Sequence, residues 1–287
     1  MKYINYLVLS LLAVLTVSSC SQDEPELNWK DADTSQTFVQ VYYMSLVPNT
    51  SANYIKYITI NGVEYSYDHQ AMITPYNFSP SYVVGSAYAT NPGKCTVKLE
   101  TESGNETDGY TRTTVYEGTT KEDLVPGEIH QVIVWDNENQ SAPIVHEFGT
   151  PTVYNSYDET YNCTWASARF YNFMFDAPGV PTKARLYFDL REKSNGPIYA
   201  SYPEGGLAFG EATDYFDTYL DPEQMESANR YVKIRHDVRA VWPDGREEIL
   251  LKNDYWSTYV GRSYHYFYHG SYNKQVFNKK LTRFTAK

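Results

Sequence analysis

The chain has 287 residues, and its 24 basic and 35 acidic side chains give a net charge of −11. This acidic balance excludes nucleic acid and anionic lipid surfaces as expected partners, because their phosphates would repel the protein. Hydrophobic residues make up 42% of the chain, which is enough for a packed core. Three cysteines are too few for a disulfide scaffold. At about 150 residues per domain, the length of the chain suggests two domains.

Residues 1–19 have the pattern of a secretory signal peptide. Lys2 provides a positive start, and an apolar run of 11 residues extends from Leu7 to Val17. Such a run makes about 16 Å of helix, which is too short to cross a hydrocarbon core of about 30 Å. The run is therefore typical of a cleaved signal rather than of a transmembrane helix.

The apolar run ends in Val17-Ser18-Ser19-Cys20, which resembles the lipobox of bacterial lipoproteins. The resemblance implies that Cys20 is lipidated; the alternative is an ordinary signal peptide in which Cys20 is incidental. Residues 23–26 are Asp-Glu-Pro-Glu and resemble the surface-export signal of Bacteroidota lipoproteins, although a short acidic run is also typical of a solvated spacer. We expect a lipid-anchored outer-membrane protein that faces outward, with residues 20–36 as its tether.

The first half of the mature chain predicts short strands. Residues 54–60 and 63–67 are β-branched and aromatic, and Asn61-Gly62 between them predicts a tight hairpin turn. Residues 94–100 alternate, so that Cys95 is expected on the apolar face of a half-buried strand. Residues 101–109 are expected to form a polar loop, and residues 128–135 another strand.

The second half repeats this style. Apolar and polar residues alternate over 184–190, and residues 231–242 and 246–252 predict a hairpin closed by Pro243-Asp244-Gly245. Asp221 and Pro222 fit the start of one short helix over about 221–228. The sequence therefore predicts an all-β fold of two tandem antiparallel β-sandwich domains.

An internal duplication organises these strands. The segment around Val41 resembles the one around Phe170 at an offset of 129 residues, and the segment after Gly127 resembles the one after Gly261 at an offset of 134. Two marker pairs at nearly one offset favour tandem copies. We expect one sandwich over 37–148, a linker over 149–162 and a second sandwich over 163–287.

Two motifs carry a family resemblance. Residues Asn172–Tyr187 and the closing run Val260-Gly261-Arg262-Ser263-Tyr264 are similar to tandem Ig-like or transthyretin-like domains of unknown function in bacterial cell-surface proteins. The match is better in the second half, since Met44 to Pro48 lacks the corresponding asparagine and Ala-Pro. The resemblance implies a surface location and a non-catalytic sandwich, and it supplies no catalytic residues.

Candidate chemistry is weak elsewhere. His265 and His269 are four residues apart, which on a strand separates them by about 13 Å, too far for one metal ion. No nucleophile motif is present, and Asp214, Asp217 and Asp221 lack the dense oxygen spacing of a calcium loop. We expect no catalytic site, metal or cofactor. Whether Cys95 pairs with Cys163 stays open.

The aromatic residues give the best indication of ligand binding. A tyrosine ring offers a sugar both an apolar face and a hydroxyl, and one face of the strand 262–269 carries three tyrosines. The alternative is that these tyrosines fill the core, because aromatic residues favour strands. The expected ligand-binding residues lie on this strand and around the loop 203–220: Tyr202, Phe209, Tyr215, Tyr219, Tyr264, Tyr266 and Tyr268.

Three classes of function remain at this point. A non-catalytic binding or accessory module for glycan, a surface protein or another macromolecule fits the anchor and the aromatic residues. An adhesive or structural subunit, such as a fimbrial or surface-layer component, is the alternative. An enzyme is the least favoured class, because no constellation of residues meets the geometric requirements of catalysis.

Overall fold

The structure is a computed structural model that describes residues 35–80, 87–148, 165–219, 231–259, 263–272 and 280–286. Over these residues the chain is strand and loop, apart from one 3₁₀ turn at Ser51–Asn53, so the all-β prediction is confirmed. The expected helix over 221–228, the signal peptide and most of the tether fall outside the described residues. No helix in the described part is long and apolar enough to cross a membrane.

The first half forms two sheets. Sheet 1 has the order β3-β2-β6-β7, and sheet 2 has the order β4-β1-β8-β9, with β5 also paired to β1. The strands of sheet 1 are β2 (Tyr57–Ile60), β3 (Val63–Ser66), β6 (Thr96–Asn105) and β7 (Gly109–Thr119). The strands of sheet 2 are β1 (Thr37–Tyr43), β4 (Asn77–Ser79), β5 (Tyr88–Thr90), β8 (Ile129–Val134) and β9 (Ile144–Glu147).

The second half forms two more sheets. Sheet 3 has the order β11-β10-β17-β18, with β14 also paired to β10, and sheet 4 has the order β13-β12-β15-β16. The strands of sheet 3 are β10 (Trp165–Ala177), β11 (Val180–Pro181), β14 (Phe216–Tyr219), β17 (Ser263–Ser271) and β18 (Lys280–Ala286). The strands of sheet 4 are β12 (Arg185–Arg191), β13 (Ile198–Leu207), β15 (Tyr231–Val241) and β16 (Glu247–Tyr259).

The two halves share one pairing scheme. β1 runs parallel to β8 with Val41 opposite Val132, and β10 runs parallel to β17 with Phe170 opposite Tyr266. These two partner pairs differ by 129 and 134 residues, the same offsets that the sequence motifs give. The halves are therefore copies in topology and register, and sheets 2 and 3 each include one parallel pair among antiparallel ones.

Local turn chemistry confirms one predicted hairpin and corrects one loop. Asn61 and Gly62 have φ of 48° and 84°, as a tight turn between β2 and β3 requires. The polar loop expected over 101–109 is wrong, because β6 continues to Asn105 and β7 begins at Gly109. The end of this hairpin is exposed to solvent, so its sequence is polar throughout and lacks the alternation that marks a half-buried strand.

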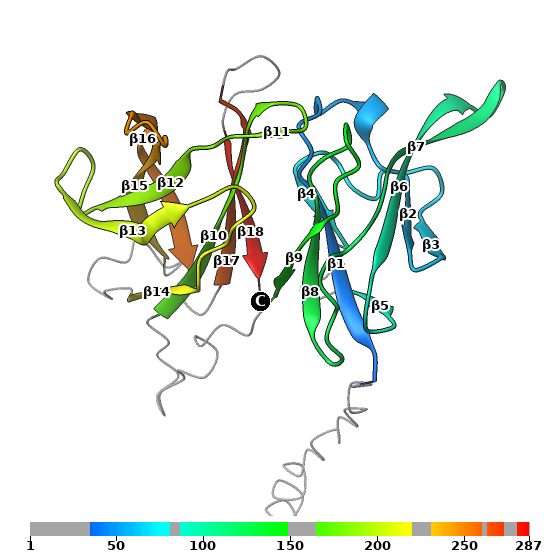
Figure 1. The fold of residues 1–287 in the computed structure, drawn as a ribbon, viewed down its shortest axis with the longest axis horizontal. Coiled ribbons are helices and arrows are strands. Elements are labelled where there is room, and N and C mark those ends of the chain that lie inside the picture. The colour runs from blue at the N-terminus through cyan, green and yellow to red at the C-terminus, as the bar shows by residue number, and fades with distance from the viewer. Residues whose placement is uncertain are drawn as a thin grey trace, which may run out of the picture. The chain divides into compact units, whose positions relative to one another are not determined.

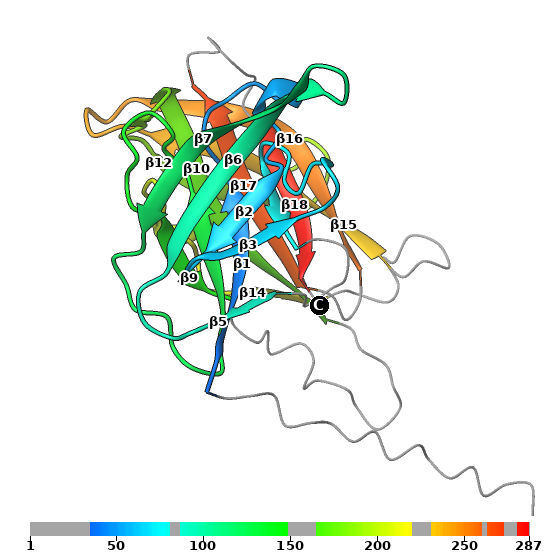
Figure 2. The same ribbon diagram turned by 90° about the vertical axis from the view of Figure 1, so that its right-hand side faces the viewer.

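The four sheets stack as layers with three buried cores between them (Figures 1 and 2). On β1, Val41 points into the core between sheets 1 and 2, whereas its neighbour Tyr42 points into the core between sheets 2 and 3. On β10, Phe170 points into the core between sheets 3 and 4, whereas Tyr171 points into the central core, which lies between sheets 2 and 3. Both faces of sheets 2 and 3 are therefore covered, which is why β17 is buried along its whole length.

The central core joins the two sandwiches into one body, since residues 35–287 form a single compact unit. The predicted domain boundaries stay predictions, because the expected linker lies outside the described residues. This layering decides where a ligand can bind on a sheet. In the described part of the chain, only the outer faces of sheets 1 and 4 are not packed against another sheet.

Candidate ligand-binding surface

The three tyrosines that the sequence places on one face of β17 lie in the core. Tyr264, Tyr266 and Tyr268 do share a face, and that face is fully buried between sheets 3 and 4. Tyr266 stacks on Phe170 at a centroid distance of 5.5 Å, and burial raises the pKa of Tyr268. These tyrosines therefore have no exposed ring on which a sugar could stack. Alternation separates the two faces of a strand, but it does not tell which face another sheet covers.

Of the other predicted binding residues, those whose side chains the structure describes do not form one exposed platform either. Phe209 packs edge-on against Trp135 at 5.1 Å within the central core. Tyr215 is half-buried and donates its hydroxyl to the carbonyl of Phe148 at 2.6 Å. Tyr202 is half-buried against the core of sheets 3 and 4, and Tyr219 lies on β14, opposite Trp165 of β10.

A buried polar network, here called the junction network, crosses the central core. The Tyr171 hydroxyl of sheet 3 donates to Gln131 Oε1 of sheet 2 at 2.6 Å. Gln131 Nε2 donates to the Tyr42 hydroxyl at 2.9 Å, and that hydroxyl donates to Gln40 Oε1 at 3.0 Å. His265 Nδ1 lies 2.6 Å from the Tyr171 hydroxyl. The network therefore gives buried polar groups of both sandwiches a partner.

His265 is neutral in this network. Burial, together with the charge of Arg169 and the neighbouring His146, lowers the pKa of His265 to about 3. A neutral imidazole carries one ring proton, and both ring nitrogens have a tyrosine hydroxyl nearby: Nδ1 lies 2.6 Å from the Tyr171 hydroxyl, and Nε2 lies 3.2 Å from that of Tyr215. His265 and Tyr171 are thus assigned to the joint between the sandwiches.

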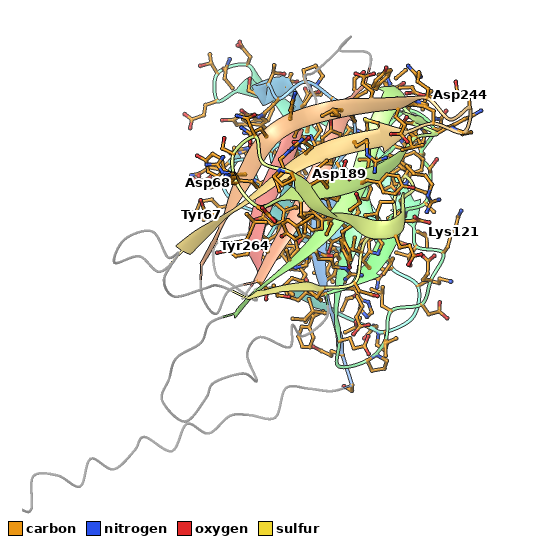
Figure 3. All side chains as sticks on the ribbon, turned by 90° about the vertical axis from the view of Figure 1, so that its left-hand side faces the viewer. Tyr67, Asp68, Lys121, Asp189, Asp244 and Tyr264 are labelled. Carbon is orange, nitrogen blue, oxygen red and sulfur yellow. The ribbon has the colours of Figure 1, made fainter. Side chains whose placement is uncertain are left out.

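The outer face of sheet 4 carries charged and apolar side chains in three transverse rows. The strand register places the members of each row opposite one another on neighbouring strands. The first row is Ile198, Arg191, Arg235 and Tyr255; the middle row is Ser201, Asp189 and Asp237; the third row is Tyr187, Arg239 and Ile249. Figure 3 looks onto this sheet and labels Asp189 near its middle.

The acids of the middle row hold the neighbouring arginines in place. Asp189 accepts from Arg239 Nε at 2.7 Å and from the Ser201 hydroxyl at 2.6 Å. Asp237 accepts from Arg191 Nε at 2.9 Å, and this bond, followed by further backbone and charge contacts that outweigh burial, lowers the pKa of Asp237. Both carboxylates are buried, so each pair is a fixed, directed contact.

The first row differs because one of its arginines, Arg235, has no carboxylate partner in the described part of the chain. Within the described residues, no carboxylate lies within ion-pairing distance of Arg235. Its guanidinium instead lies 5.6 Å from the ring centroid of Tyr255. A planar cation beside an exposed aromatic ring can bind an anionic group while the ring supports an apolar surface.

Exposed apolar side chains gather on this sheet. Among the described residues nine large hydrophobic side chains are exposed, and four of them lie on its two edge strands, β13 and β16. These four are Ile198, Tyr199, Ile249 and Tyr255. Because β13 and β16 are the two edge strands, these side chains flank the polar middle of the sheet from both sides.

On the outer face of sheet 1, by comparison, the charged side chains Arg112 and Glu102 each have an ion-pairing partner. Arg112 of β7 lies 3.4 Å above the ring of Tyr57 and pairs with Glu64 of β3 at 2.9 Å, so it crosses the sheet. Glu102 accepts from the hydroxyl of Tyr57 and pairs with His69 Nδ1 at 2.8 Å. Arg112 therefore already has the acidic partner that Arg235 lacks.

The cysteines and candidate metal ligands add no site. Cys95 is a buried free thiol, and burial raises its pKa to about 12. Cys20 and Cys163 lie outside the described residues, so lipidation and pairing with Cys163 stay predictions. The described part of the chain holds no group of three or more His, Cys, Asp or Glu side chains placed to bind a metal ion.

Sequence reasoning missed the rows of sheet 4. Residues 231–242 are correctly expected as a strand, and within them Arg235, Asp237 and Arg239 alternate with buried residues. That alternation places the three charged side chains on one face of the strand, so the charged face could have been predicted from the sequence. The pairing of Arg235 with Tyr255 depends on the register between β15 and β16, which composition does not supply.

Comparisons with known proteins assign no family. No family model and no curated protein matches the chain. A crystal structure of a "putative cell adhesion protein" from Parabacteroides distasonis is 9% identical, with a TM-score of 0.20 over 88% of this chain and 98% of that chain. One from Bacteroides uniformis, described in the same words, is 7% identical, with a TM-score of 0.22 over 88% of this chain and 99% of that chain. TM-scores this low do not indicate a shared fold.

Proposed function

We propose that this protein is a non-catalytic, lipid-anchored outer-membrane protein that binds glycan on the outer face of sheet 4. The observation that carries the proposal is that three exposed hydrophobic side chains, Ile198, Ile249 and Tyr255, lie in the charged rows of that face, with a fourth, Tyr199, on its edge strand β13. Aromatic rings and fixed arginines together suit a sugar, which presents an apolar ring face and a rim of hydroxyls.

The layered fold supports this choice of surface. The tyrosines of β17 and the junction network are enclosed, so they serve packing between sheets. Sheet 1 has the other outer face. There Arg112 forms an ion pair with Glu64 and lies over the ring of Tyr57. Sheet 4 combines exposed rings with an arginine that has no acidic partner in the described part of the chain.

A glycan array on the chain from Ser21 onward tests the proposal. Tyr199→Ala combined with Tyr255→Ala should weaken binding by roughly ten-fold, because each stacked ring contributes about 0.5–1.5 kcal/mol beyond area burial. Tyr67→Ala combined with Tyr110→Ala on the first sandwich is the matched control, since Tyr67 and Tyr199 are 58% and 57% exposed. Equal effects of the two pairs would contradict the assignment to sheet 4.

Membrane anchoring is tested separately. Cells given a fatty-acid analogue should label the wild-type chain and not the Cys20→Ala variant, because the thiol of Cys20 is the proposed lipid attachment point. Proteinase treatment of intact cells should then remove the wild-type protein if it faces outward. Equal labelling of both chains would remove the anchor, and protection from the proteinase would contradict the outward orientation. Should no glycan bind, self-association of the pure chain would favour the adhesive or structural alternative.

A further inference from the structure

We propose that Arg235 makes the outer face of sheet 4 selective for acidic glycans, meaning sugars that carry a carboxylate or a sulfate. This inference rests on the proposed function and names the ligand class of the same surface.

Arginines and carboxylates are unevenly distributed over this face. Arg239 contacts two acids, Asp189 at 2.7 Å and Glu247 at 3.3 Å. At the other end, Arg191 and Arg235 stand directly opposite each other on β12 and β15. Like charges in this position are unfavourable, and a single carboxylate, Asp237, serves this pair through its bonds to Arg191. Of the arginines in the rows, Arg191 and Arg239 therefore each have a carboxylate partner, whereas Arg235 has none among the described residues.

The nearby acids are committed elsewhere. Asp237 also accepts the backbone N–H of Asn253 at 2.7 Å, and Asp254 Oδ1 accepts the backbone N–H of Tyr255 at 2.8 Å. Neither forms an ion pair with Arg235. Within the described residues, the guanidinium of Arg235 thus keeps its donors for an anion that comes from outside the chain.

The surroundings of Arg235 fit a sugar acid better than a free inorganic anion. Tyr255 lies beside the guanidinium, and Ile198 lies two strands away in the same row. The row crosses three inter-strand spacings of about 4.8 Å, or roughly 14 Å, which is longer than one sugar ring. An acidic group would bind the fork of Arg235 bidentately while a neighbouring ring rests on Tyr255.

The preference for acidic glycans must come from one site, because the protein as a whole is negatively charged. A chain of net charge −11 repels polyanions in general, so an acidic glycan that binds must meet a specific cation. Arg235 supplies such a cation on sheet 4. Arg112, which also lies over a tyrosine ring, is neutralised by Glu64 on sheet 1.

The experiment compares three polysaccharides on the chain from Ser21 onward: neutral dextran, dextran sulfate and polygalacturonate. Binding is measured by calorimetry at low salt and at about 0.15 M salt. We expect at least one acidic polymer to bind ten-fold or more tightly than dextran. Arg235→Gln should remove that preference and most of its salt dependence. Arg112→Gln is the matched control and should leave the preference in place; unfolding midpoints check that both variants fold.

The outcomes separate this inference from the proposed function. Equal binding of acidic and neutral polymers, or an acidic preference that survives Arg235→Gln, would overturn the role of Arg235 and leave glycan binding standing. Binding to none of the polymers or array glycans would overturn both. Retention by an acidic protein partner that Arg235→Gln abolishes, without any glycan binding, would also overturn the glycan assignment.

Discussion

The hydroxyl of Tyr171 on β10 lies 2.6 Å from Oε1 of Gln131 on β8, and this contact joins the two sandwiches through a buried hydrogen bond. Both residues lie in the central layers, where no water-exposed face is available to replace a lost partner. The contact adds a polar link to the apolar central core, which joins the two sandwiches into one compact unit.

Tyr171→Phe should therefore destabilise the protein while leaving its fold intact. The change keeps the ring stacked on Phe267 and removes one hydroxyl, so that Gln131 Oε1 loses a donor in the core. An unsatisfied buried acceptor costs about 1–3 kcal/mol of the free energy of unfolding. Urea denaturation followed by tryptophan fluorescence measures this loss, with Tyr67→Phe on the exposed surface as the control. A Tyr171→Phe chain as stable as the wild type would show that the bond contributes nothing.

Mild acid should weaken the same joint. Burial lowers the pKa of His146 to about 4, helped by the charge of Arg169, and lowers that of His265 to about 3. Their folded pKa values lie below the ordinary value of about 6.5, so the unfolded chain binds protons that the folded chain does not. Stability should therefore fall as the pH drops below about 6.5, by up to about 1.4 kcal/mol per pH unit for each histidine, and this contribution levels off below the folded values.

Unfolding midpoints between pH 7 and pH 4 test this expectation. A His146→Gln variant removes one titrating group, so its stability should decline less steeply with falling pH than that of the wild type. A decline of unchanged steepness would show that His146 does not contribute to the pH dependence.

The thiol of Cys95 should not react with thiol reagents in the native protein. Its thiol lies in the core between sheets 1 and 2, and its pKa is raised to about 12, so almost no thiolate forms at pH 8. A thiol reagent should label Cys95 only after denaturation, in a chain that starts at Ser21 and carries Cys163→Ser. Rapid labelling of the native chain would contradict the burial of this strand.

Turns and the two faces of a strand could be predicted from the sequence, but which faces other sheets cover could not. Alternation correctly places Cys95 and its neighbours on a buried face, and Asn61-Gly62 correctly predicts a turn. The same alternation separates Tyr266 from Phe267, yet both lie in cores because sheets cover both sides of β17. Contacts between the sandwiches set that outcome, and they join segments that are far apart in the chain. The rows of sheet 4 depend in the same way on register across four strands.

The ion pair of Asp237 with Arg191 should be far more important for stability than that of Glu64 with Arg112. The side chains of Asp237 and Arg191 are 0% and 13% exposed, whereas those of Glu64 and Arg112 are 43% and 44% exposed. Removing one partner of a buried pair leaves an uncompensated charge and typically costs about 3–5 kcal/mol, whereas an exposed pair contributes about 0–1 kcal/mol. Asp237→Asn should therefore lower the unfolding free energy several-fold more than Glu64→Gln, as measured by urea denaturation. Because the cost comes from a stranded guanidinium, Arg191→Met combined with Asp237→Asn should recover part of the loss. A double variant that is less stable than Asp237→Asn alone would instead show that Arg191 stabilises sheet 4 through its bond to Gly196 or through packing.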